Sequence, residues 1–280
     1  MTRRALSDEQ KAAHWKATDK LARLWETRFG KAVALAFEHD RREILALLSD
    51  AKRKSLERKA TVDWQDYLLT VTDYLAMGGA DNWRSTFLPV IRGIIGARGE
   101  QLNADFGMQF DVENVYATEW FESYIATFAS PINDVTMKDI ARMMEQAQSE
   151  GWSIPTAQKH LEQLFEQYIN GTTTPEDWEW FQDRMPAYRR ELIARDQIQR
   201  SSNGGSVQIY KGYGAQRKEW LATKDNRVRD EHLAANGQVV GIDEPFIVGE
   251  YEMMFPSDDS MGAPVEMFIQ DRCTVLPVIE

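Results

Sequence analysis

The sequence predicts a mainly α fold, with a helical N-terminal body followed by a small α+β C-terminal domain. Over the first two thirds of the 280 residues, apolar side chains recur at the three- and four-residue spacing of helices. Near Asn203 the segment SSNGGS is expected to interrupt this pattern, and short apolar runs separated by Asp, Asn, Gly and Pro follow. We therefore expect a helical region over residues 1–185 and a second domain over residues 186–280.

Local signals mark the ends of several expected helices. Ser7 and Gln10 have the spacing of a capping box, and the apolar stripe after them is expected to end at Gly30, before a second helix starts. Thr136 is expected to cap the helix of residues 137–148, and Thr174 with Pro175 to begin another. Other helices are expected at 64–75, which loosens at Gly78-Gly79, and at 113–128 and 154–169.

The C-terminal region reads as short strands around a charged turn. EWLAT, GQVV and RCTVLPVI suit strands. Within KDNRVRDEHLAANGQVV, residues 227–235 are expected to form a short helix that ends at Asn236-Gly237. Arg229 and His232 are three residues apart and share one face of that helix, which indicates a rigid charged corner.

The net charge of −11 is distributed unevenly along the chain. An acidic surface repels nucleic acid, but residues 189–229 contain 10 Lys and Arg against 4 Asp and Glu, and residues 1–60 are also net basic. We interpret the basic stretch KRKSLERK as a solvated helix end, because no aromatic residue interleaves with its charges.

Motif searches favour no catalytic chemistry. The sequence contains no Walker A loop, no GxGxxG after a strand, no HExxH and no GxSxG. The single cysteine, Cys273, begins an apolar strand, where a small buried residue is more usual than a nucleophile. The first residues lack the apolar core of a secretory signal, and no segment has the length of a membrane span. We expect no catalytic residue, no cofactor and no membrane partner.

The ordered motifs of the last 95 or so residues resemble one known family. KEWLATKDNRVRDEHLAANGQVVGIDEPF, then FPSDD and DRCTVLPV, are similar to the C-terminal domain of the Mu F-like phage head morphogenesis proteins, also called minor head or minor capsid proteins. The resemblance marks these residues as a structural motif: Trp220, Asp225, Arg227, Arg229, His232, Gly237, Asp271 and Cys273.

The sequence departs from the family at a set of metal ligands. Many relatives have Cys-x-x-Cys at the corner and His-Pro-x-Cys-Arg-Cys near the end, which looks like a zinc-binding set. Here Arg229 and His232 stand at the corner, and Asp271 and Cys273 near the end. With one thiol and one imidazole left, we expect no bound metal, and we expect an ion pair between Arg229 and Asp271 to replace it.

The resemblance implies a structural virion protein inside the phage head near the portal, present in the host cytoplasm during assembly. Its implied partners are the portal protein, capsid proteins and packaged double-stranded DNA, and its implied roles are head assembly and genome delivery, including DNA ejection. The candidate DNA or portal contact consists of Arg189, Arg190, Arg195, Arg200, Lys211, Arg217 and Lys218. Two alternatives stay open: a toxin- or nuclease-type enzyme carrying this domain, and a DNA-binding protein that uses residues 189–229.

Overall fold

The computed structural model describes residues 6–108, 115–171 and 178–278, which form two compact units. Unit 1 comprises residues 1–29, 89–123 and 192–280, and unit 2 comprises residues 30–88 and 124–191. Both units are therefore discontinuous in sequence. The expected division between residues 1–185 and 186–280 stays a prediction, although the last passage from unit 2 to unit 1, at Glu191 and Leu192, lies close to it.

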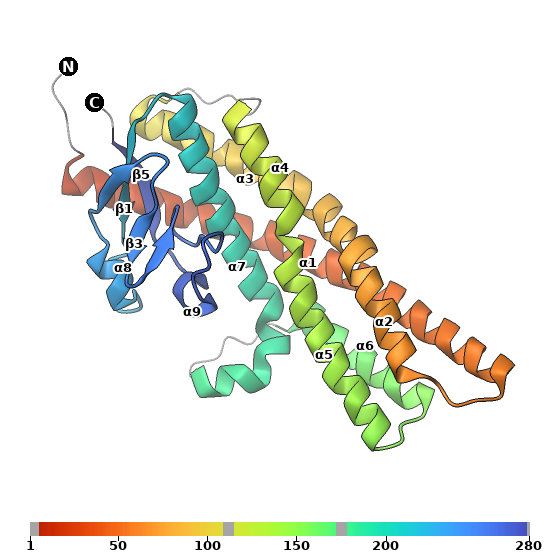
Figure 1. The fold of residues 1–280 in the computed structure, drawn as a ribbon. Helices are drawn as coiled ribbons and strands as arrows, with labels where there is room; N and C mark the ends of the chain where they lie inside the picture. The colour runs from red at the N-terminus through yellow and green to blue at the C-terminus, as the bar shows by residue number, and fades with distance from the viewer. Residues whose placement is uncertain (1–5, 109–114, 172–177, 279–280) are drawn as a thin grey trace. The chain divides into compact units, whose positions relative to one another are not determined.

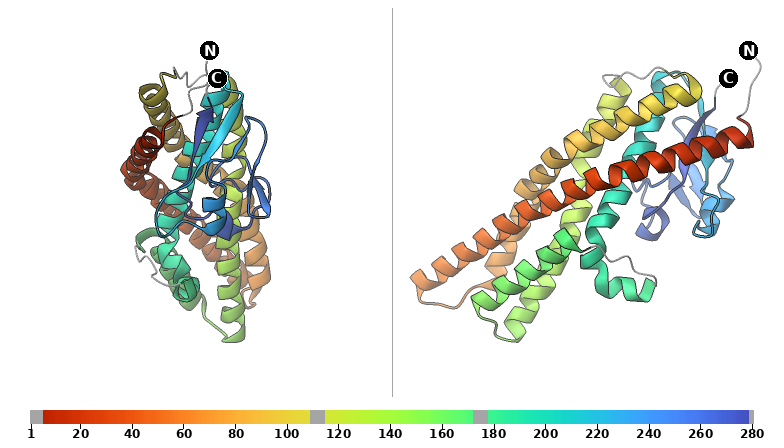
Figure 2. Two further views of the ribbon diagram at one scale, coloured as in Figure 1. Left: turned by 90° about the vertical axis from the view of Figure 1, so that its left-hand side faces the viewer. Right: turned by 180° about the vertical axis from the view of Figure 1, so that it is seen from behind.

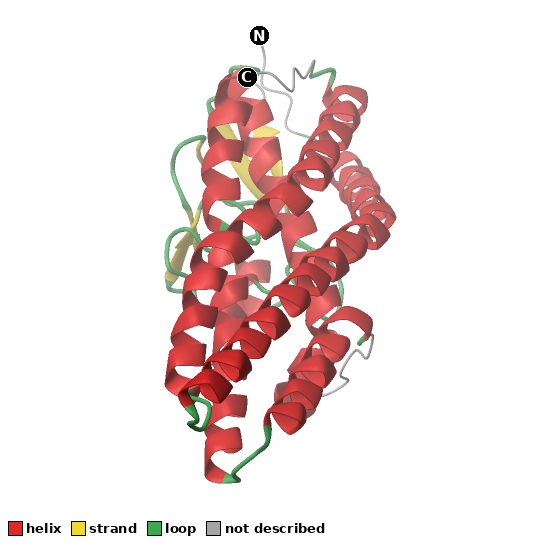
Figure 3. Cartoon of the chain, turned by 90° about the vertical axis from the view of Figure 1, so that its right-hand side faces the viewer, coloured by secondary structure: helices red, strands yellow, loops and turns green. Residues whose placement is uncertain are grey.

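Helices account for most of the described residues (Figure 3). They are α1 (Asp8–Arg58), α2 (Trp64–Tyr74), the π-helical segment η1 (Leu75–Gly79), α3 (Ala80–Phe106), α4 (Val115–Thr127), α5 (Ala129–Ser149), α6 (Ile154–Asn170) and α7 (Trp178–Gly212). The C-terminal part adds the short helices α8 (Asp230–Ala234) and α9 (Val265–Phe268) and several short strands. The predicted mainly α fold with a small α+β C-terminal part is confirmed.

The capping box at the start of α1 is confirmed. The backbone N–H of Ser7 donates to Gln10 Oε1 at 3.0 Å, and that of Gln10 donates to Ser7 Oγ at 3.2 Å. The expected end at Gly30 is wrong, because α1 continues through it. A helical glycine costs only about 1 kcal/mol, which the buried side chains of Phe29 and Val33 on either side can offset.

The helix cap expected at Thr136 is also wrong. Helix α5 begins at Ala129, and Thr136 lies buried inside it, where its hydroxyl donates to Ile132 O at 3.0 Å. This bond within the preceding turn is the alternative to capping for a helical threonine. Thr174 and Pro175 lie outside the described residues.

Unit 2 has an aromatic core around a buried carboxylate. The rings of Phe37 and Trp83 meet edge to face, with 4.9 Å between their centroids. Asp40 is fully buried and accepts hydrogen bonds from Tyr74 Oη at 2.7 Å and Trp83 Nε1 at 2.8 Å. Segment η1 follows α2 directly and includes Gly78 and Gly79, where the sequence predicts that the helix loosens. Asn133 Nδ2 donates to Leu75 O at 2.8 Å in this wider turn.

The segment SSNGGS is helical and lies inside α7, so the expected interruption is wrong. Its small residues let α7 approach its neighbours in unit 1 closely. A Cβ on Gly204 would lie 2.2 Å from the Trp120 ring, and one on Gly205 would lie 3.0 Å from Ile95. Glycine here makes room for packing and does not mark a turn.

The strands form two small antiparallel sheets. Strand β1 (Arg217–Leu221) lies between β2 (Val239–Gly241) and β5 (Thr274–Val278), with Trp220 opposite Val275. Strands β1 and β5 lie side by side in Figure 1. Strands β1, β2 and β5 confirm the predicted strands. Strands β3 (Phe246–Val248) and β4 (Tyr251–Met253) form a hairpin that the sequence analysis did not anticipate.

The start of α1 and most of α3 belong to the same unit as this sheet. The start of α1 lies beside the strands (Figure 2), where Trp15 Nε1 donates to Thr223 Oγ1 at 3.2 Å and to Arg272 O at 3.1 Å. The buried Arg98 of α3 donates to Thr274 Oγ1 of β5 at 3.1 Å. Among the described helices, none combines the length and the apolar character that crossing a membrane requires.

Candidate functional site

The corner, which we define as Arg229, His232, Asp271 and Cys273, is assembled from two segments of unit 1. Arg229 has extended backbone angles and is the N-cap residue of α8, which places His232 in the middle of this short helix. Asp271 and Cys273 come directly before β5. His232, Asp271 and Cys273 are each at most 3% exposed.

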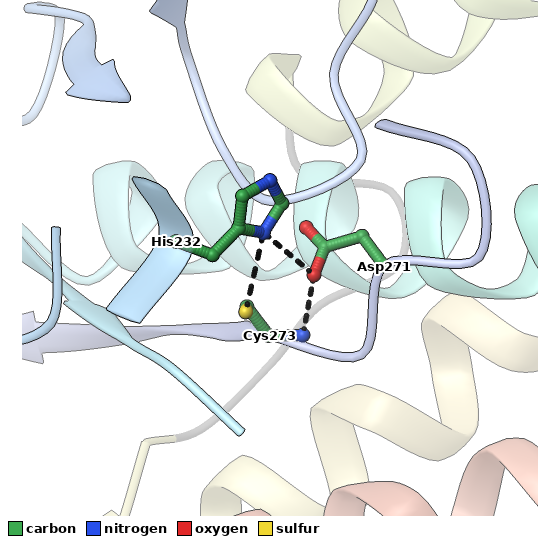
Figure 4. A group of neighbouring side chains, drawn as sticks. All are labelled: His232, Asp271 and Cys273. Carbon is green, nitrogen blue, oxygen red and sulfur yellow. Dashed lines mark hydrogen bonds and ion pairs between the residues drawn. The ribbon is translucent and has the colours of Figure 1, made fainter. Parts of the chain in front are cut away.

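The side chains of Asp271 and Cys273 converge on the imidazole of His232 (Figure 4). Its Nδ1 lies 3.2 Å from Asp271 Oδ1 and 3.6 Å from Cys273 Sγ. Its Nε2 lies 2.8 Å from the carbonyl oxygen of Met267, which can only accept a hydrogen bond. Both ring nitrogens therefore face oxygen acceptors.

Two backbone N–H groups also donate hydrogen bonds to the Asp271 carboxylate. Asp271 Oδ2 accepts from the N–H of Ser257 at 3.1 Å, and Oδ1 accepts from the N–H of Cys273 at 2.8 Å. Burial by itself would raise the pKa of Asp271, but the hydrogen bond and charge of His232 and the Cys273 N–H hold it below its ordinary value. Asp271 is therefore an ionised carboxylate that joins the 255–260 loop, α8 and β5.

The corner fits a closed structural zinc site poorly. His232, Asp271 and Cys273 offer three ligand atoms within 4.8 Å of one another, whereas structural zinc is usually held by four. Burial raises the pKa of the Cys273 thiol well above its ordinary value, and the Asp271 charge raises it further. A metal needs the thiolate, so this environment opposes binding. The expected absence of a metal stays a prediction.

The ion pair expected between Arg229 and Asp271 is corrected by the structure. Arg229 Nη2 donates to the carbonyl oxygen of Ile269 at 2.5 Å, and it is His232 Nδ1 that lies against Asp271 Oδ1, at 3.2 Å. Arg229 still ties the corner to the segment before β5, but it does so through the backbone.

The remaining motif residues shape the turns around the corner. Asp225 accepts from the backbone N–H of the exposed Arg227 at 3.0 Å and forms an ion pair with Arg272. Gly237 has a φ of +81°, which favours glycine, and its N–H donates to Trp220 O at 2.8 Å. The Trp220 ring packs edge to face on His232, with 5.5 Å between centroids. The motif residues thus gather around β1, α8 and β5.

Three of the seven candidate contact residues point into the protein, which corrects the expected contact surface. Arg189 donates to Thr136 Oγ1 at 2.9 Å, Arg200 donates to Asp259 Oδ2 at 2.6 Å, and Lys218 Nζ donates to Ile242 O at 3.0 Å. Each of the three is at most 5% exposed. Their charges are used to hold helices and loops together, so they cannot form an external contact in this conformation.

The other four candidates are partly exposed. Arg190 donates to Ile169 O at 2.6 Å, Arg195 Nε lies 3.5 Å from Glu26 Oε1, and Lys211 Nζ lies 2.5 Å from Asp243 Oδ1. Arg217 is half-buried at the start of β1. A role for these four in binding DNA or the portal stays a prediction.

Asn203 is a central residue that the sequence analysis missed. Its Nδ2 donates to Pro256 O and Cys273 O, both at 3.1 Å, and its Oδ1 accepts from Thr274 Oγ1 at 3.1 Å. It therefore connects α7 to the 255–260 loop and to β5, next to the corner. The only sequence signal was an asparagine within SSNGGS, a composition typical of a loop.

Comparisons with known proteins bear on the same region. The family model of phage Mu protein F-like proteins matches residues 138–274, which include the corner, α7 and most of the strands. Neither the comparison with curated proteins nor that with solved structures gave a match. Residues 138–274 are therefore similar to the phage Mu protein F-like family, a family of structural proteins of phage head morphogenesis.

Proposed function

We propose that the protein is a minor head component of a tailed phage that associates with the portal protein or the inner capsid surface during head assembly. The observation that carries this proposal is the family match over residues 138–274. The proposed location is the head interior near the portal, with the host cytoplasm as the site of assembly. A role in genome delivery belongs to the same proposal.

The chemistry of the corner supports a structural role. His232 and Asp271 are buried against each other, and the Cys273 thiol is held in its neutral form by burial. A nucleophile needs the thiolate and access to a substrate. The same groups link α8, the 255–260 loop and β5. In this proposal, the corner therefore stabilises unit 1 by holding these three segments together.

The two alternatives have less support. An enzyme of the toxin or nuclease type would need catalytic residues in an accessible site, and the sequence shows no motif of that kind. A DNA-binding protein that uses residues 189–229 would need those cations on its surface, whereas Arg189, Arg200 and Lys218 are buried. Packaged DNA stays a proposed partner through the exposed cations alone.

Quantitative mass spectrometry of purified procapsids and mature heads tests the proposal. We expect a few copies of this protein per particle in both, and a loss of these copies from particles assembled without the portal protein. The major capsid protein serves as the internal standard. Absence from both kinds of particle would exclude a head component, and an unchanged copy number without the portal would move the partner to the capsid surface.

A further inference from the structure

Unit 2 contains a pocket between two helical faces. Its volume is about 380 Å³, and it lies where the end of α2, segment η1 and the start of α3 face the α4–α5 junction and the first half of α5. We call it the α5 pocket. All of its lining residues belong to unit 2, so the pocket does not depend on how the two units are arranged.

One wall of the α5 pocket follows a single face of α5. The residues of this wall lie three, four and seven positions apart and therefore on one side of the helix: Ser130, Asn133, Asp134 and Met137. Ser130 and Asp134 are exposed, whereas Asn133 is only 5% exposed. This wall therefore offers a hydroxyl, an amide and a carboxylate close to one another.

The opposite wall is small and mostly apolar. Ala76, Ala80 and Arg84 line it at a four-residue spacing, beside Leu75 in segment η1. The short alanine side chains leave space between the helices, which accounts for a cavity at this junction. A π-helical turn such as η1 is frequent at functional sites. The wall can therefore receive an apolar group while Arg84 supplies a charge at one end.

Two side chains reach across the α5 pocket and hold its walls together. Asn133 Nδ2 donates to Leu75 O at 2.8 Å, and Arg84 Nη2 donates to Ala126 O at 2.8 Å. All four residues line the pocket. A site that is fixed in this way before binding loses little conformational entropy when a ligand enters.

The same two side chains each keep one polar atom unsatisfied. Asn133 Oδ1 and Arg84 Nε are buried, and neither has a hydrogen-bond partner among the described residues. A buried polar atom without a partner costs about 1–3 kcal/mol. A ligand that donates a hydrogen bond to the Asn133 amide and accepts one from the Arg84 guanidinium would recover this cost at both places.

The charges of the α5 pocket match these two requirements. Asp134 follows Asn133 and shares the face of Ser130, so the end that needs a donor also carries a carboxylate. An ammonium group suits this end, because it combines a positive charge with three donors. Arg84 supplies the cation at the other end, where its Nη1 also donates to the exposed Asp81 at 3.0 Å. A carbonyl or carboxylate oxygen suits that end.

The two ends are separated by about two helical turns. Arg84 is bonded to Ala126, which precedes Asn133 by seven residues. Phe128, between α4 and α5, has a φ of −62° and a ψ of −26°, so the backbone stays helical and rises by about 10 Å over this stretch. Two extended peptide residues span about 7 Å, and a hydrogen bond of about 3 Å at each end completes the distance.

We propose that the α5 pocket binds the first two residues of a peptide whose α-ammonium group is free. The ammonium donates to Asn133 Oδ1 and to the Asp134 carboxylate, and the carbonyl oxygen of the second residue accepts from Arg84 Nε. An apolar side chain of the peptide packs against Leu75 and the alanines of the opposite wall. This chemistry is shared by a free dipeptide and by the N-terminal segment of another protein.

Isothermal titration calorimetry of the full chain with L-leucyl-L-alaninamide tests the proposal, because this amide reproduces the start of a longer peptide. We expect saturation at one peptide per chain. The N-acetylated amide lacks the ammonium group and should bind at least about tenfold more weakly. L-leucyl-L-alanine separates the two sources: tighter binding than the amide would indicate a free dipeptide, and equal or weaker binding would indicate an N-terminal segment.

Matched variants test the two walls. Asp134→Asn should weaken binding of the amide about tenfold, because it removes the charge that faces the ammonium. Glu145→Gln is its control, since Glu145 is exposed about three turns further along α5 and does not line the pocket. Ala76→Leu fills the pocket without a change of charge and should also weaken binding at least about tenfold. Circular dichroism should show that all three variants keep their helical content.

Three results would overturn the proposal. The first is a folded parent protein that gives neither heat nor amide NMR shifts with L-leucyl-L-alaninamide at millimolar concentration. The second is an N-acetylated amide, or an Asp134→Asn variant, that binds as tightly as the unmodified pair. The third is binding with NMR shifts confined to residues outside 72–84 and 126–137. These measurements use no phage particles, so their failure would leave the proposed role in head assembly untouched.

Discussion

His232 lies between two oxygen acceptors, one at each ring nitrogen. Met267 O faces its Nε2 and Asp271 Oδ1 faces its Nδ1, and the ring packs against Trp220. Among the described residues, no lysine or arginine forms an ion pair with Asp271, and His232 is its side-chain partner from α8. The stability of the corner therefore depends on this one imidazole more than on Arg229, whose bond goes to a backbone carbonyl.

Replacing His232 by alanine should lower the free energy of unfolding by about 3 kcal/mol, because Asp271 would remain buried without the imidazole hydrogen bond and a cavity would be left beside Trp220. Urea unfolding followed by circular dichroism measures the change. Leu233→Ala is the control, since Leu233 is 49% exposed on the same helix, and it should change stability by no more than about 0.5 kcal/mol. Equal effects of the two variants would show that the corner does not stabilise unit 1.

His14 should make stability depend on pH. Burial, together with the nearby Arg98 charge, lowers the pKa of His14 to about 4. The unfolded chain takes up this proton near the ordinary value of 6.5, so the free energy of unfolding should fall as the pH decreases from 6.5 towards 4. The full loss amounts to about 3 kcal/mol.

His14→Gln separates this effect from other titrations. His14 Nε2 faces the donor Arg98 Nη2 at 3.0 Å, and Nδ1 lies 2.6 Å from Asp105 Oδ2, so a glutamine amide can both accept and donate here. Unfolding by urea at several values of pH should show a flatter profile for the variant between 6.5 and 4. Parallel profiles would rule out His14 as the origin.

The corner should be stable without a bound metal at Asp271 and Cys273. Treatment with a strong chelator followed by gel filtration is expected to leave the thermal unfolding temperature unchanged, and elemental analysis of the untreated protein should find no stoichiometric zinc. The reason is the poor fit of a three-ligand set whose thiol is held protonated. A lower unfolding temperature after chelation would show that a metal does complete the corner.

At the scale of elements, α7 is unusual because polar residues are buried along much of its C-terminal half. Asn203 bonds to the 255–260 loop and β5, and Arg200 bonds to Ser257 O at 3.1 Å and to Asp259. Burial raises the pKa of Asp196 to about 6, although the Arg200 charge opposes the shift. Helix α7 thus acts as a hydrogen-bonded support for the loops of the C-terminal part.

Two helical glycines, one packed against a neighbouring side chain and one beside open space, test how closely the helices of unit 1 pack. Gly204→Ala should destabilise the protein by about 1–3 kcal/mol, because its Cβ would meet the Trp120 ring at 2.2 Å. Gly96→Ala in α3 has nothing within 4 Å and should stabilise by about 0.5–1 kcal/mol through helix propensity. Thermal unfolding of both variants compares them, and the same sign for both would contradict the packing described for Gly204.

Element prediction succeeded where the signal was local. Ser7 and Gln10 bond to each other across one turn, so their spacing alone identified the helix start. Thr136 and SSNGGS were misread because the same residue types serve as caps, as turn formers or as small packing residues. Which role applies depends on neighbours such as Trp120 and Ile95, which are distant in sequence.

At the scale of the whole molecule, unit 1 combines three separate stretches of chain. Lys11 forms an ion pair with Glu219, and Arg98 reaches Ser206 Oγ at 2.9 Å and Thr274. The core of the C-terminal part also includes Leu102 and Met108 from the α3 region. The family motif therefore completes its core with residues that precede the family match.

A fragment of residues 186–280 should consequently fail to fold alone, although the motif lies within it. Removal of residues 8–29 and 89–108 would expose the apolar side of its core and leave Thr274 and Glu219 without these partners. The two-dimensional amide NMR spectrum of the fragment should show little dispersion, whereas the full chain should show a dispersed spectrum. A dispersed spectrum of the fragment would support an independent domain at the predicted boundary.

The sequence by itself determined the mainly α class, the positions of β1, β2 and β5, the first capping box and the family resemblance of the C-terminal part. These features depend on periodicity, on contacts a few residues apart and on ordered motifs, which a single chain displays directly. Only the tertiary structure decided that Arg189, Arg200 and Lys218 point inward and that His232 replaces Arg229 as the partner of Asp271. The physical reason is that the desolvation and the pairing of a charged side chain are set by groups that folding brings together, and these groups are often distant in sequence.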